Sequence, residues 1–203
     1  ATGTSSRAPW LMILRSPAVW FLCVQQFCRA AGYIFFGSWF ATYLQEARGV
    51  TIVGAGWLTS LPVLADVLGC MTGGLLSDTV LRRTGSERLA RQGLSVVSLL
   101  SCAGLIALAW LVQSAVLAVM VISAGMFCAA IVNPCFGATV VRQGGSNAAT
   151  LGAIGNMCGN LGAAAFPVAV PWLVHHAGGW NAVSVGFGVL YVIAARFWLL
   201  AEM

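Results

Sequence analysis

The sequence predicts an all-α membrane protein in which six transmembrane helices form one bundle. Of the 203 residues, 60% are hydrophobic and only 7% are charged, whereas a soluble domain carries about 25% charged residues. Six apolar runs each approach or exceed the roughly 20 residues that a helix needs to cross a bilayer. The basic residues gather between these runs, so the net charge of +5 reflects membrane topology and not a nucleic-acid surface.

The predicted spans follow a short polar segment. Residues 1–16 are expected to form a cytoplasmic linker, and Pro17 suits a first helical turn, where its missing N–H costs nothing. The remaining residues, 17–203, are expected to form the bundle. Its spans cover about 17–44, 52–77, 94–112, 115–141, 148–174 and 181–201.

A cluster of arginines orients these spans. Arg82, Arg83, Arg88 and Arg91 are expected to lie in a polar loop between the second and third spans. Arginines in short loops indicate the cytoplasmic side of a membrane. Both termini are then cytoplasmic, and Arg48 is the one basic residue outside. The expected location is the plasma (inner) membrane.

The first span carries polar residues in its middle. Gln26, Arg29 and Tyr33 are spaced by three and four residues, so they share one helix face, with Gln25 beside them. A charged side chain at this depth almost always faces a cavity or a partner. The pattern predicts a substrate path in which Arg29 attracts a carboxylate. The alternative is a structural arginine paired with an acid.

Asp66 in the second span is the candidate partner of Arg29. Each residue lies about 12 positions, or about 18 Å, from the inner end of its span. We therefore expect an Arg29–Asp66 ion pair or a shared water cavity. Asp66 could instead bind the coupling proton, and a purely structural pair also remains open.

Amide side chains mark two further spans. Asn133 precedes Pro134, which removes a backbone hydrogen bond and breaks the fourth span; such breaks often border binding sites. Asn156 and Asn160 share a face of the fifth span and can both donate and accept hydrogen bonds. The alternatives are a kink in which Asn133 binds the freed carbonyl, and amides that hydrogen-bond between helices.

Glycines predict close contacts between helices. Gly69, Gly73 and Gly74 lie on one face of the second span, and the fifth span carries a similar face. Without side chains there, another helix can approach closely. The glycines of the fifth span are Gly152, Gly155 and Gly159.

No set of residues suggests an enzyme or a cofactor. The seven cysteines form no C-x-x-C pair and no cluster with histidine at metal-binding spacing. No Ser/His/Asp set or phosphate-binding loop is visible. We therefore expect a protein that is not an enzyme and that binds no metal, cofactor or nucleic acid.

Several motifs resemble the major facilitator superfamily. The stretch from Gly74 through Asp78 to Arg82 and Arg83 is similar to its G-x-x-x-D-x-x-x-R-R loop. Other segments resemble the anion:cation symporter branch, which contains sialin, hexuronate and galactonate transporters. These segments are Gln26-Phe27, Phe35 to Leu44 with Arg48-Gly49, Ser60-Leu61-Pro62, and Gly152 to Pro167.

The resemblance implies the C-terminal half of a twelve-span transporter that works by alternating access. Its partners would be a missing N-terminal six-helix half, a small organic anion such as a sugar acid, and a coupling proton or sodium ion. The resemblance also implies that Gln26, Asn133 and Asn156 line a central cavity. Gly74, Asp78, Arg82 and Arg83 would form the conformational-switch loop, with Asp78 as a cytoplasmic latch.

Two other functions remain open at this point. The bundle could belong to an exporter or exchanger of a non-anionic solute, in which Asp66 neutralises Arg29. It could also be a non-transporting membrane sensor or an assembly subunit. A cavity plugged by bulky side chains would favour the sensor.

Overall fold

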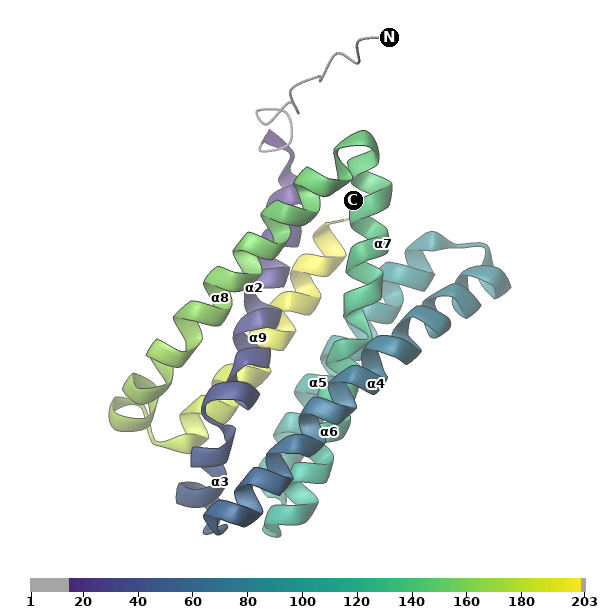
Figure 1. Cartoon of the computed structure of the whole chain (residues 1–203). Coiled ribbons are helices and arrows are strands. Elements are labelled where there is room, and N and C mark those ends of the chain that lie inside the picture. Colours follow the sequence, from purple (N-terminus) through teal and green to yellow (C-terminus); the bar gives the residue numbers. More distant parts are fainter. Residues whose placement is uncertain (1–14, 202–203) are drawn as a thin grey trace.

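The computed structural model describes residues 15–201, and this part of the chain is built from helices (Figure 1). The expected linker lies almost wholly outside the described residues. The helical elements are α2 (Pro17–Ser38), α3 (Phe40–Arg48), α4 (Ile52–Thr84), the π-helical η1 (Arg88–Gly93), α5 (Leu94–Leu111), α6 (Ala115–Ala130), α7 (Val132–Gly144), the 3-10 turn η2 (Gly145–Asn147), α8 (Ala148–His176) and α9 (Trp180–Leu200).

Five helical stretches in the described part are long and apolar enough to cross a membrane. One of them, Ala115–His176, comprises 62 residues. A straight helix of that length would measure about 93 Å, three times the hydrocarbon thickness of a bilayer. The stretch is not straight, because the chain reverses between α7 and α8 (Figure 1). Gly145 permits the reversal with a backbone φ of 49°.

Two of the expected spans are broken within the membrane. The stretch 17–44 divides at Trp39, whose φ of −120° and ψ of −11° leave the helical region and separate α2 from α3. The stretch 115–141 divides at Ile131, between α6 and α7. Pro134 lacks the N–H that would bind the carbonyl of Ala130, so the break predicted from Pro134 is confirmed.

The helices pack as two groups that meet along α5 and α9. In the first group α2 packs against α8 and α9; in the second α4 packs against α6, and α6 against α5 (Figure 1). Glycines set the closest contacts, as predicted. A Cβ on Gly69 would collide with the carbonyl oxygen of Phe127 in α6, and one on Gly73 would lie 2.7 Å from the Cα of Ile131. In α8, the predicted Gly155 lies against α7, since a Cβ there would be 2.7 Å from the ring of Phe136. The closest contact with α2 is at Gly162, which was not among the predicted glycines: a Cβ there would collide with the carbonyl oxygen of Phe27.

The expected switch loop is helical at Asp78, Arg82 and Arg83, which corrects the sequence-based expectation; Gly74 was already expected within the second span. Gly74, Asp78, Arg82 and Arg83 belong to α4, which continues to Thr84 and ends where Gly85 adopts a φ of 64°. No residue between Asp78 and Thr84 prevents a helix. At 33 residues, α4 is about 50 Å long, so its last turns extend beyond a hydrocarbon core of about 30 Å.

The ends of several helices lie at the same end of the bundle. The start of α2, the end of α4, the α7–α8 turn and the end of α9 lie together, whereas α3, the α5–α6 turn and the α8–α9 connection lie at the opposite end (Figure 1). The first end carries the arginines between α4 and α5, and the second end carries Arg48.

Candidate functional site

A neighbouring side chain on α2 orients the guanidinium of Arg29 in the middle of that helix. Its Nε donates a hydrogen bond of 2.9 Å to Oε1 of Gln26, which is only 6% exposed. The spacing of three residues places the two side chains on the same face of the helix. One amide oxygen thus orients the guanidinium and leaves its two terminal nitrogens available to another group.

Asp66 on α4 is the acid that faces this guanidinium. The charges of Arg29 and Asp66 interact electrostatically, although no ion pair within 4.0 Å joins them. Both side chains are half-buried. The expected direct ion pair is therefore absent from the structure, and a cavity shared by the two groups remains a prediction.

Tyr191 on α9 lies against α2 close to Arg29, and nothing in the sequence had singled it out. Its hydroxyl oxygen would lie 2.8 Å from a Cβ on Gly32, which is three residues, or about one helical turn, beyond Arg29. Its side chain is fully buried, and its hydroxyl donates to the sulfur of Met126 at 3.9 Å. A phenol hydroxyl in the middle of the apolar last span was the signal that could have revealed it.

The predicted amide residues are accessible but lie on other helices. Asn133 is half-buried at the start of α7, and Asn156 and Asn160 are exposed on α8. None of the three side chains hydrogen-bonds to another residue of the described range 15–201. Tyr33, another predicted substrate contact, is 39% exposed. These groups are therefore free to bind another molecule.

Helix α8 brings its amides close to the polar face of α2. A Cβ on Gly159 would lie 3.7 Å from the carbonyl oxygen of Gln26 and 3.6 Å from the Cβ of Ala30. Asn160 is the next residue along α8, on the exposed flank of this contact. The structure thus places Gln26, Arg29 and Asn160 on two helices in direct contact.

The residues expected to act in the switch are mostly exposed. Asp78, Arg82 and Arg83 are exposed at the end of α4, and Gly74 is half-buried against Pro134. The side chain of Asp78 has no ion-pair partner among the described residues, while Nε of Arg82 donates to its carbonyl oxygen at 3.4 Å. The carboxylate is therefore free to meet a group outside the described residues.

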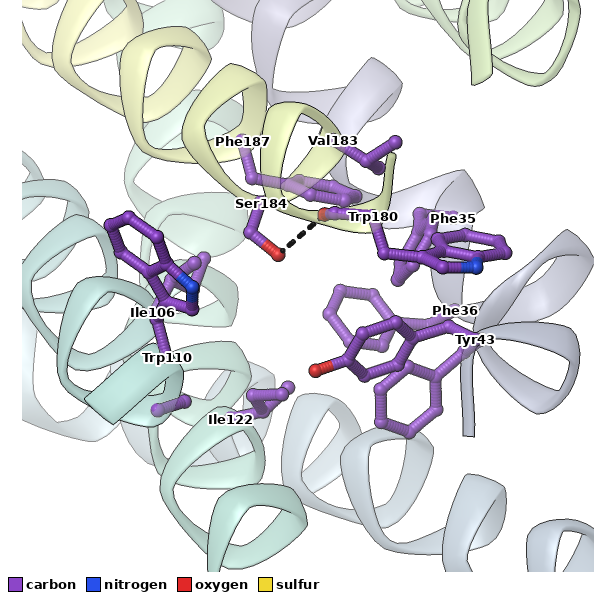
Figure 2. A pocket seen from close by; sticks show the side chains of 12 residues that line it. Phe35, Phe36, Tyr43, Ile106, Trp110, Ile122, Trp180, Val183, Ser184 and Phe187 are labelled. Carbon is purple, nitrogen blue, oxygen red and sulfur yellow. Dashed lines mark hydrogen bonds between the residues drawn. The ribbon is translucent and has the colours of Figure 1, made fainter. Parts of the chain in front are cut away.

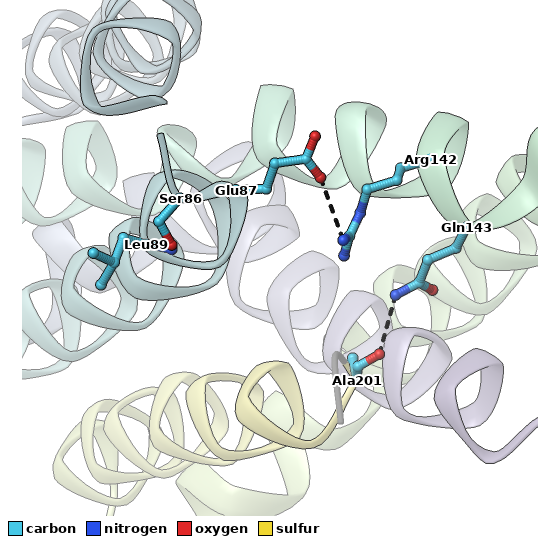
Figure 3. A network of polar contacts seen from close by, with 6 residues as sticks. All are labelled: Ser86, Glu87, Leu89, Arg142, Gln143 and Ala201. Carbon is cyan, nitrogen blue, oxygen red and sulfur yellow. Dashed lines mark hydrogen bonds and ion pairs between the residues drawn. The ribbon is translucent and has the colours of Figure 1, made fainter. Parts of the chain in front are cut away.

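A polar network closes the arginine-rich end of the bundle. Glu87 and Arg142 form an ion pair of 3.3 Å between the α4–α5 connection and α7, and Gln143 donates to the carbonyl of Ala201 (Figure 3). Gln92 in η1 donates to the carbonyls of Trp198 and Leu199 at 3.3 and 2.7 Å. Two glutamines thus bind the last carbonyls of α9, which have no partner within the helix.

One further buried amide has no partner. Gln25 is fully buried, and neither its amide nitrogen nor its oxygen finds a hydrogen bond within the described residues. Such a group costs free energy unless another state of the protein or a water molecule satisfies it. The sequence analysis noted its polarity but assigned the substrate contact to its neighbour Gln26.

Metal-binding clusters are not found in the described part of the chain. No group of three histidine, cysteine, aspartate or glutamate side chains within residues 15–201 is arranged to hold a metal ion. The seven cysteines, all of them described, are free thiols.

Comparisons with known proteins identify the family of this chain. Residues 2–167 match the family model of the Major Facilitator Superfamily. The chain is 29% identical over 187 residues to the probable sulfoacetate transporter SauU of Cupriavidus necator, covering 92% of this chain and 43% of that protein. It is 28% identical over 179 residues to the probable galactarate/D-glucarate transporter GudP of Escherichia coli, covering 87% and 39%.

A third relative is matched over a similar share of its length. The probable galactarate/D-glucarate transporter GudP of Bacillus subtilis is 29% identical over 203 residues, which cover 97% of this chain and 43% of that protein. The chain thus spans less than half the length of the curated relatives it matches.

Proposed function

Because the chain belongs to the Major Facilitator Superfamily, a family of transporters and not of enzymes, we propose that it forms one half of a secondary transporter for a small organic anion. The relatives named above are probable transporters of sulfoacetate and of galactarate or D-glucarate. These compounds are organic acids that are negatively charged near neutral pH. A carboxylate or sulfonate with hydroxyl groups is therefore the substrate class that this half would help to bind.

The half would cross the membrane six times, with both ends in the cytoplasm. Counting α6–α7 and α8 as separate crossings turns the five apolar stretches into six. The positive charges at the α2, α4 and α9 ends favour placing that side in the cytoplasm. The relatives are more than twice as long as this chain, which supports a second half of similar size.

The hydrogen bond between Gln26 and Arg29 carries the substrate proposal. It fixes a guanidinium within the span while leaving terminal N–H groups available, and a guanidinium can bind a carboxylate or sulfonate through two parallel hydrogen bonds. Tyr33, Asn133, Asn156 and Asn160 would supply contacts to the rest of the solute. They suit hydroxyl groups because a side-chain amide both donates and accepts.

Asp66 would couple transport to an ion. When the anion binds Arg29, the carboxylate loses part of the attraction of its nearest positive charge. A proton or a sodium ion could then compensate Asp66. This step would produce symport. If Asp66 instead neutralises Arg29, the alternative of an exporter or exchanger of a non-anionic solute applies.

Uptake into proteoliposomes tests the proposal. The full-length transporter would be assayed with sulfoacetate, D-glucarate, galactarate and a neutral sugar, with and without an inward proton gradient. We expect one acid to accumulate and Arg29→Gln to raise its KM about 10- to 100-fold, the equivalent of a charged hydrogen bond. Arg196→Gln is the matched control, because Arg196 is exposed near the inner end of α9.

Three results would change the conclusion. Equal effects of both arginine substitutions would remove Arg29 from the substrate site. Flux of the neutral sugar alone would favour the exporter or exchanger of a non-anionic solute. No flux of any solute by a folded, inserted protein would favour a membrane sensor or an assembly subunit.

A further inference from the structure

A second feature of the bundle lies away from the proposed substrate site. An open groove of about 570 Å³ lies between helices α5 and α9, and none of the predicted substrate residues lines it. Its floor includes small residues, among them Gly104 and Ala107 of α5 and Gly188 of α9. A Cβ added to Gly104 or Gly188 would meet nothing within 4 Å, so the groove is empty space beside these glycines.

The groove offers an apolar surface without free hydrogen-bonding groups. The polar residue in its wall is Ser184, whose hydroxyl donates to the carbonyl of Trp180 at 3.1 Å (Figure 2). The indole N–H of Trp110 donates to the side-chain oxygen of Asn181 at 3.1 Å. An occupant of the groove therefore needs no polar groups of its own along this length.

Its dimensions match one leaflet of a bilayer. The groove extends along α5 from Leu100 to Trp110, ten residues or about 15 Å, which is half of a hydrocarbon core of about 30 Å. Trp110 and Asn181 stand at the end nearest the α5–α6 turn. Tryptophan side chains of this kind gather at the level of the lipid headgroups.

The groove is continuous with the surface that faces the lipid. Both helices belong to stretches apolar enough to cross a membrane, and their large exposed side chains around the groove include Leu108, Leu111, Val185, Val189 and Val192. Because none of the proposed substrate residues lies on α5 or α9, this surface is expected to contact acyl chains and not the second half. A recess of leaflet length in it admits one chain between the two helices.

An aromatic pocket adjoins the end of the groove nearest the α5–α6 turn. Ile106, Trp110 and Ser184 line both, and the pocket continues inward among rings that include Phe35, Tyr43 and Phe187 (Figure 2). Its volume of about 30 Å³ is far smaller than that of the groove. An extended chain therefore occupies the groove and contacts the pocket only through the three shared residues.

We propose that the α5–α9 groove is a lipid site, which holds one acyl chain of a phospholipid from the leaflet nearest the α5–α6 turn. The headgroup lies beside Trp110 and Asn181, and the chain runs past Gly104 and Gly188 toward Leu100. This site is independent of the anion site, because no residue belongs to both.

Lipid retention measured by native mass spectrometry tests this site. The protein would be taken from bilayers of phosphatidylethanolamine and phosphatidylglycerol and transferred to detergent. We expect one tightly retained phospholipid on the parent protein and its loss from the double variant Gly104→Leu/Gly188→Leu, whose new side chains fill the groove. Gly186→Leu is the matched control, since a Cβ there also meets nothing within 4 Å, while residue 186 lies outside the groove.

A second measurement is made in the intact bilayer, because detergent could remove a lipid that is bound there. Spin-labelled phosphatidylcholine in the intact bilayer should show a motionally restricted fraction that falls by about one lipid per protein in the double variant and not in Gly186→Leu. An unchanged restricted fraction would overturn the proposal. So would a parent protein that is dimeric and becomes monomeric in the double variant, because a second copy would then occupy the groove.

Discussion

Tyr191 of α9 fills the space that a side chain at residue 32 of α2 would need. A Cβ on Gly32 would lie 2.8 Å from the Tyr191 hydroxyl oxygen and 2.9 Å from the adjoining ring carbon. The absence of a side chain at Gly32 therefore sets how closely α2 and α9 approach. It also positions the buried hydroxyl about one helical turn from Arg29.

We expect Gly32→Ala to displace Tyr191 and to lower the free energy of unfolding by about 1–3 kcal/mol, the usual cost of overpacking. Unfolding of the purified protein in detergent measures this loss. Gly37→Ala is the control on the same helix, since a Cβ there meets nothing within 4 Å. Equal stability of the two variants would show that α9 moves away without cost.

The contact between α4 and α6 depends on Gly69 in the same way. A methyl group there would collide with the carbonyl of Phe127 and lie 2.9 Å from the Cβ of Ala130. Because backbone cannot yield as a flexible side chain does, we expect Gly69→Ala to lower the unfolding temperature. Gly56→Ala, in an open part of α4, should leave it unchanged or raise it, because alanine favours a helix more than glycine does. A matching decrease there would show that the loss in Gly69→Ala does not come from the contact with Phe127.

Gln92 should stabilise the end of α9. Its amide binds the carbonyls of Trp198 and Leu199, and burying these groups without partners costs about 1–3 kcal/mol. We expect Gln92→Leu to accelerate hydrogen exchange in the last turn of α9. The control is Gln113→Leu in the exposed α5–α6 turn. Unchanged exchange in Gln92→Leu would mean that water replaces the amide.

Removing the charge of Asp66 should uncouple transport from the ion gradient. We expect Asp66→Asn to abolish the gradient dependence of acid uptake while substrate binding persists, because Arg29 remains in place. Uptake with and without an inward proton or sodium gradient measures this change. Glu87→Gln, an exposed acid outside the site, is the control. Gradient-dependent uptake at the level of the parent protein would exclude Asp66 from coupling.

Asp78 should act as a latch with the other half of the transporter. Its carboxylate is exposed at the end of α4 and has no ion-pair partner among the described residues. We expect Asp78→Asn to shift the inward- and outward-facing populations, which the accessibility of introduced cysteines reports. The same populations in Asp78→Asn and the parent protein would contradict the latch.

The sequence predicted those features that depend on local chemistry. Its apolar runs identified the helical stretches, Pro134 identified the break between α6 and α7, and the glycines of α4 identified a close helix contact. Each follows from what a residue lacks: charge, a backbone N–H, or a side chain. The motif around Gly74 and Asp78 also indicated the family. These properties act within a few residues and are therefore readable along the chain.

The tertiary structure decided how separate helices share their polar groups. It packed Tyr191 against Gly32, bound Gln92 to the last carbonyls of α9, and left Gln25 without a partner among the described residues. It also extended α4 through Arg83, where the sequence analysis had expected a loop. Such contacts join residues that are far apart in the chain, and which side chains meet depends on the rotation and depth of each helix in the packed bundle.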